Sequence, residues 1–205
     1  ASKDLDQIEK LTLRLGSTEN DQELEIGAEF VEWMKTKQKI HTLILDVGAG
    51  IRNYTYGAIY PPSVQNCCDA ILTLKNLKNL SVGFGCPSYY KANSKPALRA
   101  FSSRKDRSII SSFLAGCPQI KNLDLTIGSG YLNDLELRKI LTSIGNMREL
   151  LTWDFKGNFA DITKKAVNEF QKAVQQMLLE GRRISFIHTY DLEESFAKGL
   201  SEFLD

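Results

Sequence analysis

A short pattern of apolar and polar positions recurs along the chain. In its clearest copy, apolar residues at Ile120, Leu123, Leu125 and Ile127 alternate with polar ones and are followed by Gly128. Successive side chains of a β-strand point to opposite sides, so this alternation is typical of a strand with one buried face. The pattern therefore predicts a short strand that packs its apolar side chains into a core.

The same frame occurs at three earlier places with one spacing. The copies are Ile8, Leu11, Leu13, Leu15 and Gly16; Ile40, Leu43, Leu45, Val47 and Gly48; and Leu77, Leu80, Val82, Phe84 and Gly85. Two looser copies follow at 147–157 and 184–190. The second apolar residues of the four regular copies lie 32, 37 and 43 positions apart, which leaves room for a helix after each strand.

Amphipathic segments fill the intervals between the predicted strands. We expect helices over 19–35, 63–75, 108–115, 133–144 and 161–180. Asp106 and Asn133 precede two of them at positions that suit a helix cap, and Gly181 is placed to end the last one. The sequence thus predicts an α/β fold of about six strand–helix units, which form a short, irregular arc with a parallel sheet.

The fifth copy of the pattern allows two registers. Without a slip, Thr152 and Asp154 would be buried, and the concave face would present Leu151, Trp153 and Phe155. A slip of one residue reverses these positions. We favour the slip because burying an unpaired Asp side chain costs several kcal/mol. The unslipped register keeps Trp153 as a candidate partner contact.

The repeated unit resembles the leucine-rich repeat superfamily, in the long, helix-containing form of ribonuclease inhibitor and F-box adaptors. The signature L-x-x-L-x-L is matched at Ile120, Leu123 and Leu125, and Cys117-Pro118 is similar to the entry of F-box repeats. Where the family places Asn or Cys after the strand, this chain has Gly16, Gly48, Gly85 and Gly128. The resemblance covers nearly all of residues 1–205 as a single domain. It implies a solenoid that acts as a non-catalytic protein-interaction module, scaffold or adaptor.

Composition changes this picture little. The 205 residues include 26 Lys and Arg against 25 Asp and Glu, a net charge of +1, so no overall field favours nucleic acid or an anionic membrane. No apolar run reaches the length of a bilayer span. Four cysteines without framework spacing, and no apolar signal segment near the start, lead us to expect an intracellular, cytoplasmic protein.

Two inter-strand segments are longer than the repeat requires, and we expect them to form a rim that contacts a partner. Segment 48–62 carries Tyr54, Tyr56 and Tyr60. Segment 86–107 is strongly basic, and its candidate contact residues are Tyr89, Tyr90, Lys91, Lys95, Arg99, Arg104, Lys105 and Arg107. Tyrosine and arginine dominate protein interface energies, so another protein is the favoured partner. Nucleic acid is the alternative, because aromatic and basic side chains also bind bases and phosphates.

The outward positions of the strands form a second candidate surface, the concave face. Its residues are Arg14, Ile44, Asp46, Asp124 and Thr126, with Trp153 added in the unslipped register. A rigid array of strands can present such a face at little entropic cost on binding.

Catalytic chemistry has one candidate motif. Residues 43–50, Leu-Ile-Leu-Asp-Val-Gly-Ala-Gly, look like the first motif of Rossmann-type methyltransferases, whose glycine loop lets the backbone approach S-adenosylmethionine. Arg52 replaces the third glycine of that motif, and 53–62 is turn-like where the fold needs a helix. A methyltransferase-like enzyme is therefore kept only as the alternative. His41, His188 and the cysteines lack the spacing of a triad or zinc site, so no catalytic residue, cofactor or metal is assigned.

Overall fold

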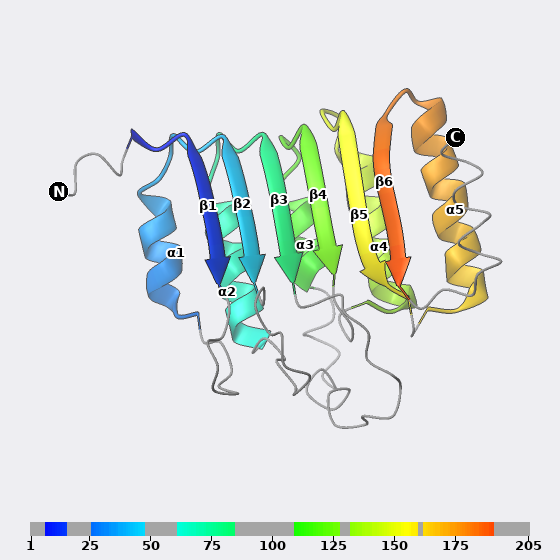
Figure 1. Ribbon diagram of the computed structural model, residues 1–205, viewed down its shortest axis with the longest axis horizontal. Coiled ribbons are helices and arrows are strands. Elements are labelled where there is room, and N and C mark those ends of the chain that lie inside the picture. Colours follow the sequence, from blue (N-terminus) through cyan, green and yellow to red (C-terminus); the bar gives the residue numbers. More distant parts are fainter. Residues whose placement is uncertain are drawn as a thin grey trace.

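A computed structural model of the chain describes residues 7–15, 26–47, 61–84, 109–127, 132–159 and 162–190. Strands and helices alternate through these ranges, as the sequence predicts (Figure 1). The strands are β1 (Lys10–Leu15), β2 (Thr42–Val47), β3 (Asn79–Phe84), β4 (Asn122–Ile127), β5 (Thr152–Asn158) and β6 (Arg183–Tyr190). The helices are α1 (Ala28–Lys35), α2 (Pro61–Leu72), α3 (Ile109–Ala115), α4 (Asp134–Asn146) and α5 (Lys164–Leu179).

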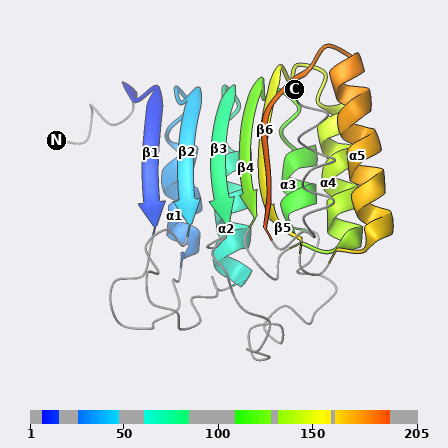
Figure 2. The same cartoon turned by 45° about the vertical axis from the view of Figure 1, so that its right-hand side comes forward.

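All six strands pair in parallel within one sheet, in the order in which they occur along the chain. Strand–helix–strand connections are nearly always right-handed, so a sheet that grows in one direction places successive helices on one side. The helices of the described chain do lie on one side (Figures 1 and 2). A doubly wound sheet differs, because its strand order reverses and helices cover both faces.

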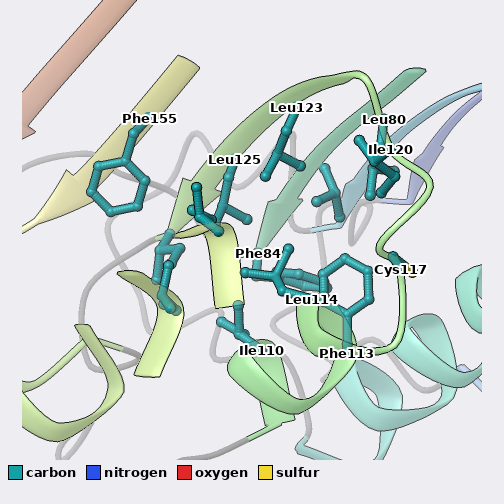
Figure 3. Close-up of a cluster of buried hydrophobic side chains, with 14 of the residues drawn as sticks. Leu80, Phe84, Ile110, Phe113, Leu114, Cys117, Ile120, Leu123, Leu125 and Phe155 are labelled. Carbon is teal, nitrogen blue, oxygen red and sulfur yellow. The ribbon is translucent and has the colours of Figure 1, made fainter. Parts of the chain in front are cut away.

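The register aligns the apolar frame of each unit with that of the next. Leu43, Leu80, Leu123 and Trp153 are successive partners across β2 to β5. The inward residues of these four strands are at most 2% exposed, apart from Gly157 at the end of β5. They pack on the helices in one continuous core, which Figure 3 shows around α3 and Phe113.

The slipped register of β5 is confirmed. Trp153 and Phe155 are 1% and 0% exposed, whereas Leu151 is 59% exposed. The assignment of Trp153 to the concave face is therefore wrong. The turn before the strand explains this register. The Leu150 N–H donates to the Met147 carbonyl, and in each of the three preceding units the first apolar residue of the frame bonds in the same way to the residue three places before it. Leu150 thus occupies the position that Ile120 has in the clearest copy of the pattern.

An aromatic cluster follows from this register. The rings of Trp153, Phe155, Phe159 and Phe170 lie with centroids 5.5 to 6.2 Å apart, in tilted and edge-to-face pairs. Such arrangements are the favoured ones for aromatic pairs. The region of β5 and α5 is therefore packed with large aromatic side chains, including Trp153, the largest in the described core.

Helix limits agree with the predicted segments to within three residues except at the start of α1, which begins at Ala28 rather than at residue 19. Residues 19–25 and Asp106 lie outside the described residues. The Asn133 cap is confirmed, because its side chain accepts hydrogen bonds from the N–H groups of Leu135 and Glu136. Gly181, with φ of +79°, ends α5 as predicted, in the left-handed conformation that glycine adopts readily.

Side chains also tie the start of one helix to its neighbour. The Ser63 Oγ accepts a hydrogen bond of 2.8 Å from the Ile26 N–H, just before α1. The Asp134 carboxylate accepts from the N–H and hydroxyl of Thr163, the cap of α5, at 2.8 and 2.6 Å. Helix starts carry unpaired N–H groups, and here adjacent units supply some of the acceptors.

Glu136 makes a further buried link, and it is the one that involves a carboxylate in the core. It is 1% exposed, and its carboxylate accepts from the Ser111 N–H at 2.8 Å and the Ser111 hydroxyl at 3.2 Å. Burial raises the pKa of Glu136, and the two bonds from Ser111 and the charge of Lys139 oppose that rise. This carboxylate therefore joins α4 to the first turn of α3 at an electrostatic cost.

Candidate functional site: the open face of the sheet

The side of the sheet away from the helices is the candidate site, and it is called the open face below. No described helix covers it (Figure 2). Its side chains in β1 to β5 are small, polar or charged, with one branched apolar exception, Ile44; they are Lys10, Thr12, Arg14, Thr42, Ile44, Asp46, Asn79, Ser81, Gly83, Asn122, Asp124, Thr126, Thr152, Asp154 and Lys156. Arg183 continues the face at the start of β6.

A row of hydrogen-bonded side chains crosses the open face where the strands begin. The Asn79 amide donates to the Thr42 Oγ1 at 2.9 Å, and the Asn122 amide donates to the Asn79 Oδ1 at 2.5 Å. The Thr152 hydroxyl then donates to the Asn122 Oδ1 at 2.6 Å. The row fixes the side chains of β2 to β5 relative to one another, so this part of the face is preorganised.

Asp124 lies at the centre of the face. Its Oδ2 accepts a hydrogen bond of 2.9 Å from the Ser81 hydroxyl, while its Oδ1 is buried and has no hydrogen-bond partner in the described structure. Asp154 is its register partner on β5, about 4.8 Å away along the sheet, and Asp154 makes interactions of its own. A buried oxygen of this kind is usually completed by water or another donor.

Gly83 leaves a position without a side chain on the open face, between Asp46 and Thr126. A Cβ atom at Gly83 would lie 3.3 Å from the Asp46 Oδ1 and 3.7 Å from the Thr126 Cβ, so a side chain there would press on its neighbours. Partial burial raises the pKa of Asp46, and the charge of Arg14 lowers it by less. The ionised Asp46 is thus incompletely compensated, and a further cation would stabilise it.

The predicted concave-face residues other than Trp153 lie together on this face. Arg14 and Asp46 are register partners, as are Ile44 and Thr12, while Asp124 and Thr126 lie on β4. The predicted rim residues fall within 48–60 and 85–108, outside the described residues, so the rim remains a prediction.

Sequence reasoning missed the hydrogen-bonded row. Its signal was present, because Lys-Asn-Leu occurs at 78–80 and again at 121–123, which puts Asn79 and Asn122 at one place of the frame. Identical polar residues at one place of a repeat come to lie side by side once the strands pair in register. Their bonding could have been inferred from that repetition.

Other candidate chemistry finds little support in the described chain. The thiols of Cys67, Cys68 and Cys117 are buried, and burial raises the pKa of Cys67 and of Cys117 to about 12, so both stay protonated at neutral pH. The exposed His41 ring contacts the Thr42 hydroxyl at 2.9 Å. The described residues contain no group of three or more His, Cys, Asp or Glu arranged to hold a metal ion.

Comparison with known proteins found neither a family model nor a curated protein that matches the chain. None of the described helices is both long and apolar enough to cross a membrane. Inferences about function therefore rest on the geometry of the described surfaces.

Proposed function

We propose that the chain is a non-catalytic protein-interaction module of the leucine-rich repeat type, a scaffold or adaptor that presents the open face of its sheet to a partner protein. One observation carries the proposal: helices lie on one side of a six-stranded parallel sheet, and the other side is an uncovered, largely polar surface. Stacked units of this kind offer a broad surface whose backbone is already ordered before binding.

The regularity of the units supports the leucine-rich repeat assignment. Strands β1 to β4 each have six residues and pair without an offset, which is the behaviour of a repeated unit. The turns that enter β2 to β5 also share one backbone hydrogen bond. In each, the N–H of the first apolar residue of the frame donates to the carbonyl of the residue three places before it. The helices vary more, from 7 residues in α3 to 16 in α5.

The chemistry of the face favours a partner that supplies a Lys or Arg side chain. Asp46 lies beside the bare position at Gly83, and one oxygen of Asp124 on β4 lacks a donor among the described residues. A guanidinium or ammonium group could pair with either carboxylate, and charge-assisted hydrogen bonds are stronger than neutral ones. The predicted rim at the strand ends would then be a second contact surface.

The methyltransferase-like alternative has less support. Rossmann-type sheets bind their cofactors where the strand order reverses, and the strands described here run from β1 to β6 without a reversal. Titration with S-adenosylmethionine in a calorimeter tests this alternative directly. Saturable heat that disappears in Asp46→Ala would favour the enzyme over the interaction module.

The proposal is tested by comparing three multiple-alanine variants in quantitative affinity purification. The open-face variant replaces Arg14, Asp46, Asp124 and Thr126; the rim variant replaces Tyr89, Tyr90, Arg99 and Arg104; and the control replaces the exposed α5 residues Lys165, Asn168 and Lys172. We expect the open-face variant to lose a protein that the wild type and the control retain, with melting temperatures nearly unchanged.

Two results would count against the open face. Retention of the partner by the open-face variant, with loss in the rim variant, would place the site on the strand-end loops. Equal loss in the α5 control would mean that no specific surface had been identified.

A further inference from the structure

The edge of the molecule where helices end and strands begin carries concentrated positive charge. This edge comprises the turns 36–41, 73–78, 116–121, 147–151 and 180–182, at the top of Figure 1. These turns contain seven Lys or Arg residues against two Glu residues, although the whole chain has 26 against 25. The edge therefore differs in charge from the open face, whose centre is acidic.

Three of the seven cations are accounted for by the fold itself. Lys37 is buried, with its Nζ 5.5 Å from the centre of the Trp33 ring. Lys75 donates to the carbonyl oxygen of the last residue of α2 at 3.1 Å. Arg182 donates to two carbonyl oxygens in the last turn of α4, at 2.8 and 3.0 Å. Cations favour the ends of helices in this way, because the terminal carbonyl groups are unpaired and carry negative partial charge.

Three of the remaining four cations are held more loosely, while Lys39 donates to the Gln7 side chain. Lys78 and Lys121 share one carboxylate, that of Glu149, with Nζ–Oε2 distances of 3.3 and 4.0 Å, and their side chains are 39% and 46% exposed. Arg148, next to Glu149, is exposed. Surface ion pairs of this kind contribute about 0 to 1 kcal/mol, so the lysines can exchange Glu149 for the carboxylates of a partner at little cost.

An exposed leucine lies among these cations. Leu151 is 59% exposed, and the residues of known placement include only two other exposed large hydrophobic side chains. Its N–H donates to the Lys121 carbonyl at 2.7 Å, and its own carbonyl accepts from the Arg183 N–H at 2.8 Å. Because Asn122 pairs with Thr152 in the register, Lys121 lies level with Leu151 on the neighbouring strand, about 4.8 Å away. The register that buries Trp153 leaves this leucine in solvent.

We propose that Lys78, Lys121, Arg148 and Leu151, the leucine patch, bind an acidic segment of a partner protein that carries a leucine or phenylalanine side chain. The carboxylates of the segment pair with the three cations, and its apolar side chain covers Leu151. This surface is separate from the open face, so the inference does not depend on what that face binds.

A protein segment fits the patch better than a nucleic acid does. Proteins that bind single strands combine cations with aromatic side chains on which bases stack, and the leucine patch contains no aromatic residue. An exposed leucine contributes nothing to phosphate binding, whereas it gives an acidic peptide an apolar contact. Its burial removes apolar surface from water on both partners.

The test measures peptide binding by fluorescence anisotropy. The probe is a short, labelled, glutamate-rich peptide with two leucines, and the matched peptide has serine in place of both. We expect the leucine peptide to bind the wild type, and Leu151→Ser to weaken that binding about tenfold or more, as the loss of a buried leucine contact implies. Lys121→Glu with Arg148→Glu should abolish binding.

Matched controls lie on α5. Leu179→Ser removes a leucine that is 83% exposed but lies outside the patch, and should leave binding unchanged. Lys165→Glu with Lys172→Glu, both at exposed positions, should weaken binding less than the charge reversal in the patch. The open-face variant should bind the peptide as the wild type does, so failure of the proposed function would be seen separately.

Three outcomes would overturn the inference. They are equal affinity of the two peptides for the wild type, equal effects of Leu151→Ser and Leu179→Ser, and tighter binding of an oligothymidylate that is insensitive to Leu151→Ser. The last outcome would define a general polyanion surface instead. The two peptides are compared on unaltered protein, so a folding defect in a variant cannot explain that result.

Discussion

The first and fourth strand–helix units carry the same apolar frame but are buried to different extents. The three inward leucines of β1 are half-buried, whereas Leu123, Leu125 and Ile127 of β4 are at most 2% exposed. β1 lies at an edge of the sheet and pairs with β2 alone, while β4 lies between β3 and β5. Burial in a stacked array is thus set by neighbours on both sides, not by the unit's own sequence.

The helices of the two units differ in the same direction. α1 has 8 residues, one fully buried side chain, Met34, and no side-chain hydrogen bond at its cap, Gly27. α4 has 13 residues and is capped by Asn133. The repeated pattern therefore specifies which side of each unit is apolar, while position in the stack and local capping decide how much each unit contributes to stability.

The largest expected effect comes from matched leucines in the two strands. Leu125→Ala should lower the free energy of unfolding by about 2 to 5 kcal/mol, because it removes buried methyl groups and leaves a cavity. Leu13→Ala should cost less than about half as much, since Leu13 is already partly in water. Chemical denaturation measures both. Equal losses would show that the edge strand is covered as fully as the centre.

The link between α3 and α4 gives the next largest effect. Glu136→Ala removes the acceptor for the N–H and hydroxyl of Ser111. A buried donor left unpaired costs about 1 to 3 kcal/mol, and denaturation at neutral pH should show a loss in that range. Ser63→Ala removes the acceptor for the Ile26 N–H before α1, and its loss of stability is the corresponding measurement for the first unit. No loss in Glu136→Ala would mean that water replaces the carboxylate.

The same link should depend on pH. The raised pKa of Glu136 means that the folded state holds this proton more tightly than the unfolded chain does. Relative to Glu136→Gln, the wild type should be most stable below the ordinary pKa of 4.5 and should lose stability as pH rises through the folded-state pKa. This pH-dependent loss in the free energy of unfolding should be smaller than the loss caused by Glu136→Ala at neutral pH. Denaturation curves from pH 4 to 8 measure it, with the exposed Glu32→Gln as control; a difference independent of pH would contradict it.

Removing the cap of α4 should bring the fourth unit closer to the first. Asn133→Ala deletes the acceptor for two N–H groups at the helix start and should cost about 1 kcal/mol. Asn133→Asp keeps an acceptor and should cost less. Thermal and chemical denaturation of both variants provide the measurement, and equal costs would show that the cap bonds are not responsible.

The smallest effect is a gain in the first unit. Gly27 has extended backbone angles, φ −78° and ψ 174°, that any residue adopts. The atom nearest to an added Cβ would be the carboxylate oxygen of Glu29, at the end of a flexible side chain. Gly27→Ser should therefore stabilise the protein by a few tenths of a kcal/mol through a new cap bond, and Gly27→Ala should not. A loss in the serine variant would show that Glu29 cannot move aside.

Local patterns were sufficient to predict much of the fold. Alternation of period two identified the inward residues of β1 to β4, and the cost of burying Asp154 selected the correct register of β5. Asn133 marked the start of α4 because its side chain can bond the first N–H groups without any tertiary partner. These features depend on interactions close in sequence or on the burial of one residue type.

Features that depend on neighbours were not predicted. The half-burial of the β1 leucines reflects the lack of a further strand beyond β1 in the described sheet, which a periodic sequence does not reveal. The Ser81–Asp124 bond and the exposure of Leu151 depend on the strand register and on the turn before β5. Both candidate surfaces were therefore only partly visible in the sequence.

The order of the strands also bears on how the protein is made. Each strand pairs with the strands synthesised just before and just after it, and no strand enters between two others. The growing chain can therefore add each unit to the existing sheet as that unit leaves the ribosome. Every intermediate of this process exposes a newly formed strand edge, which can pair with another chain. The newly formed edge thus moves along the nascent protein, from β2 toward β6, as translation proceeds.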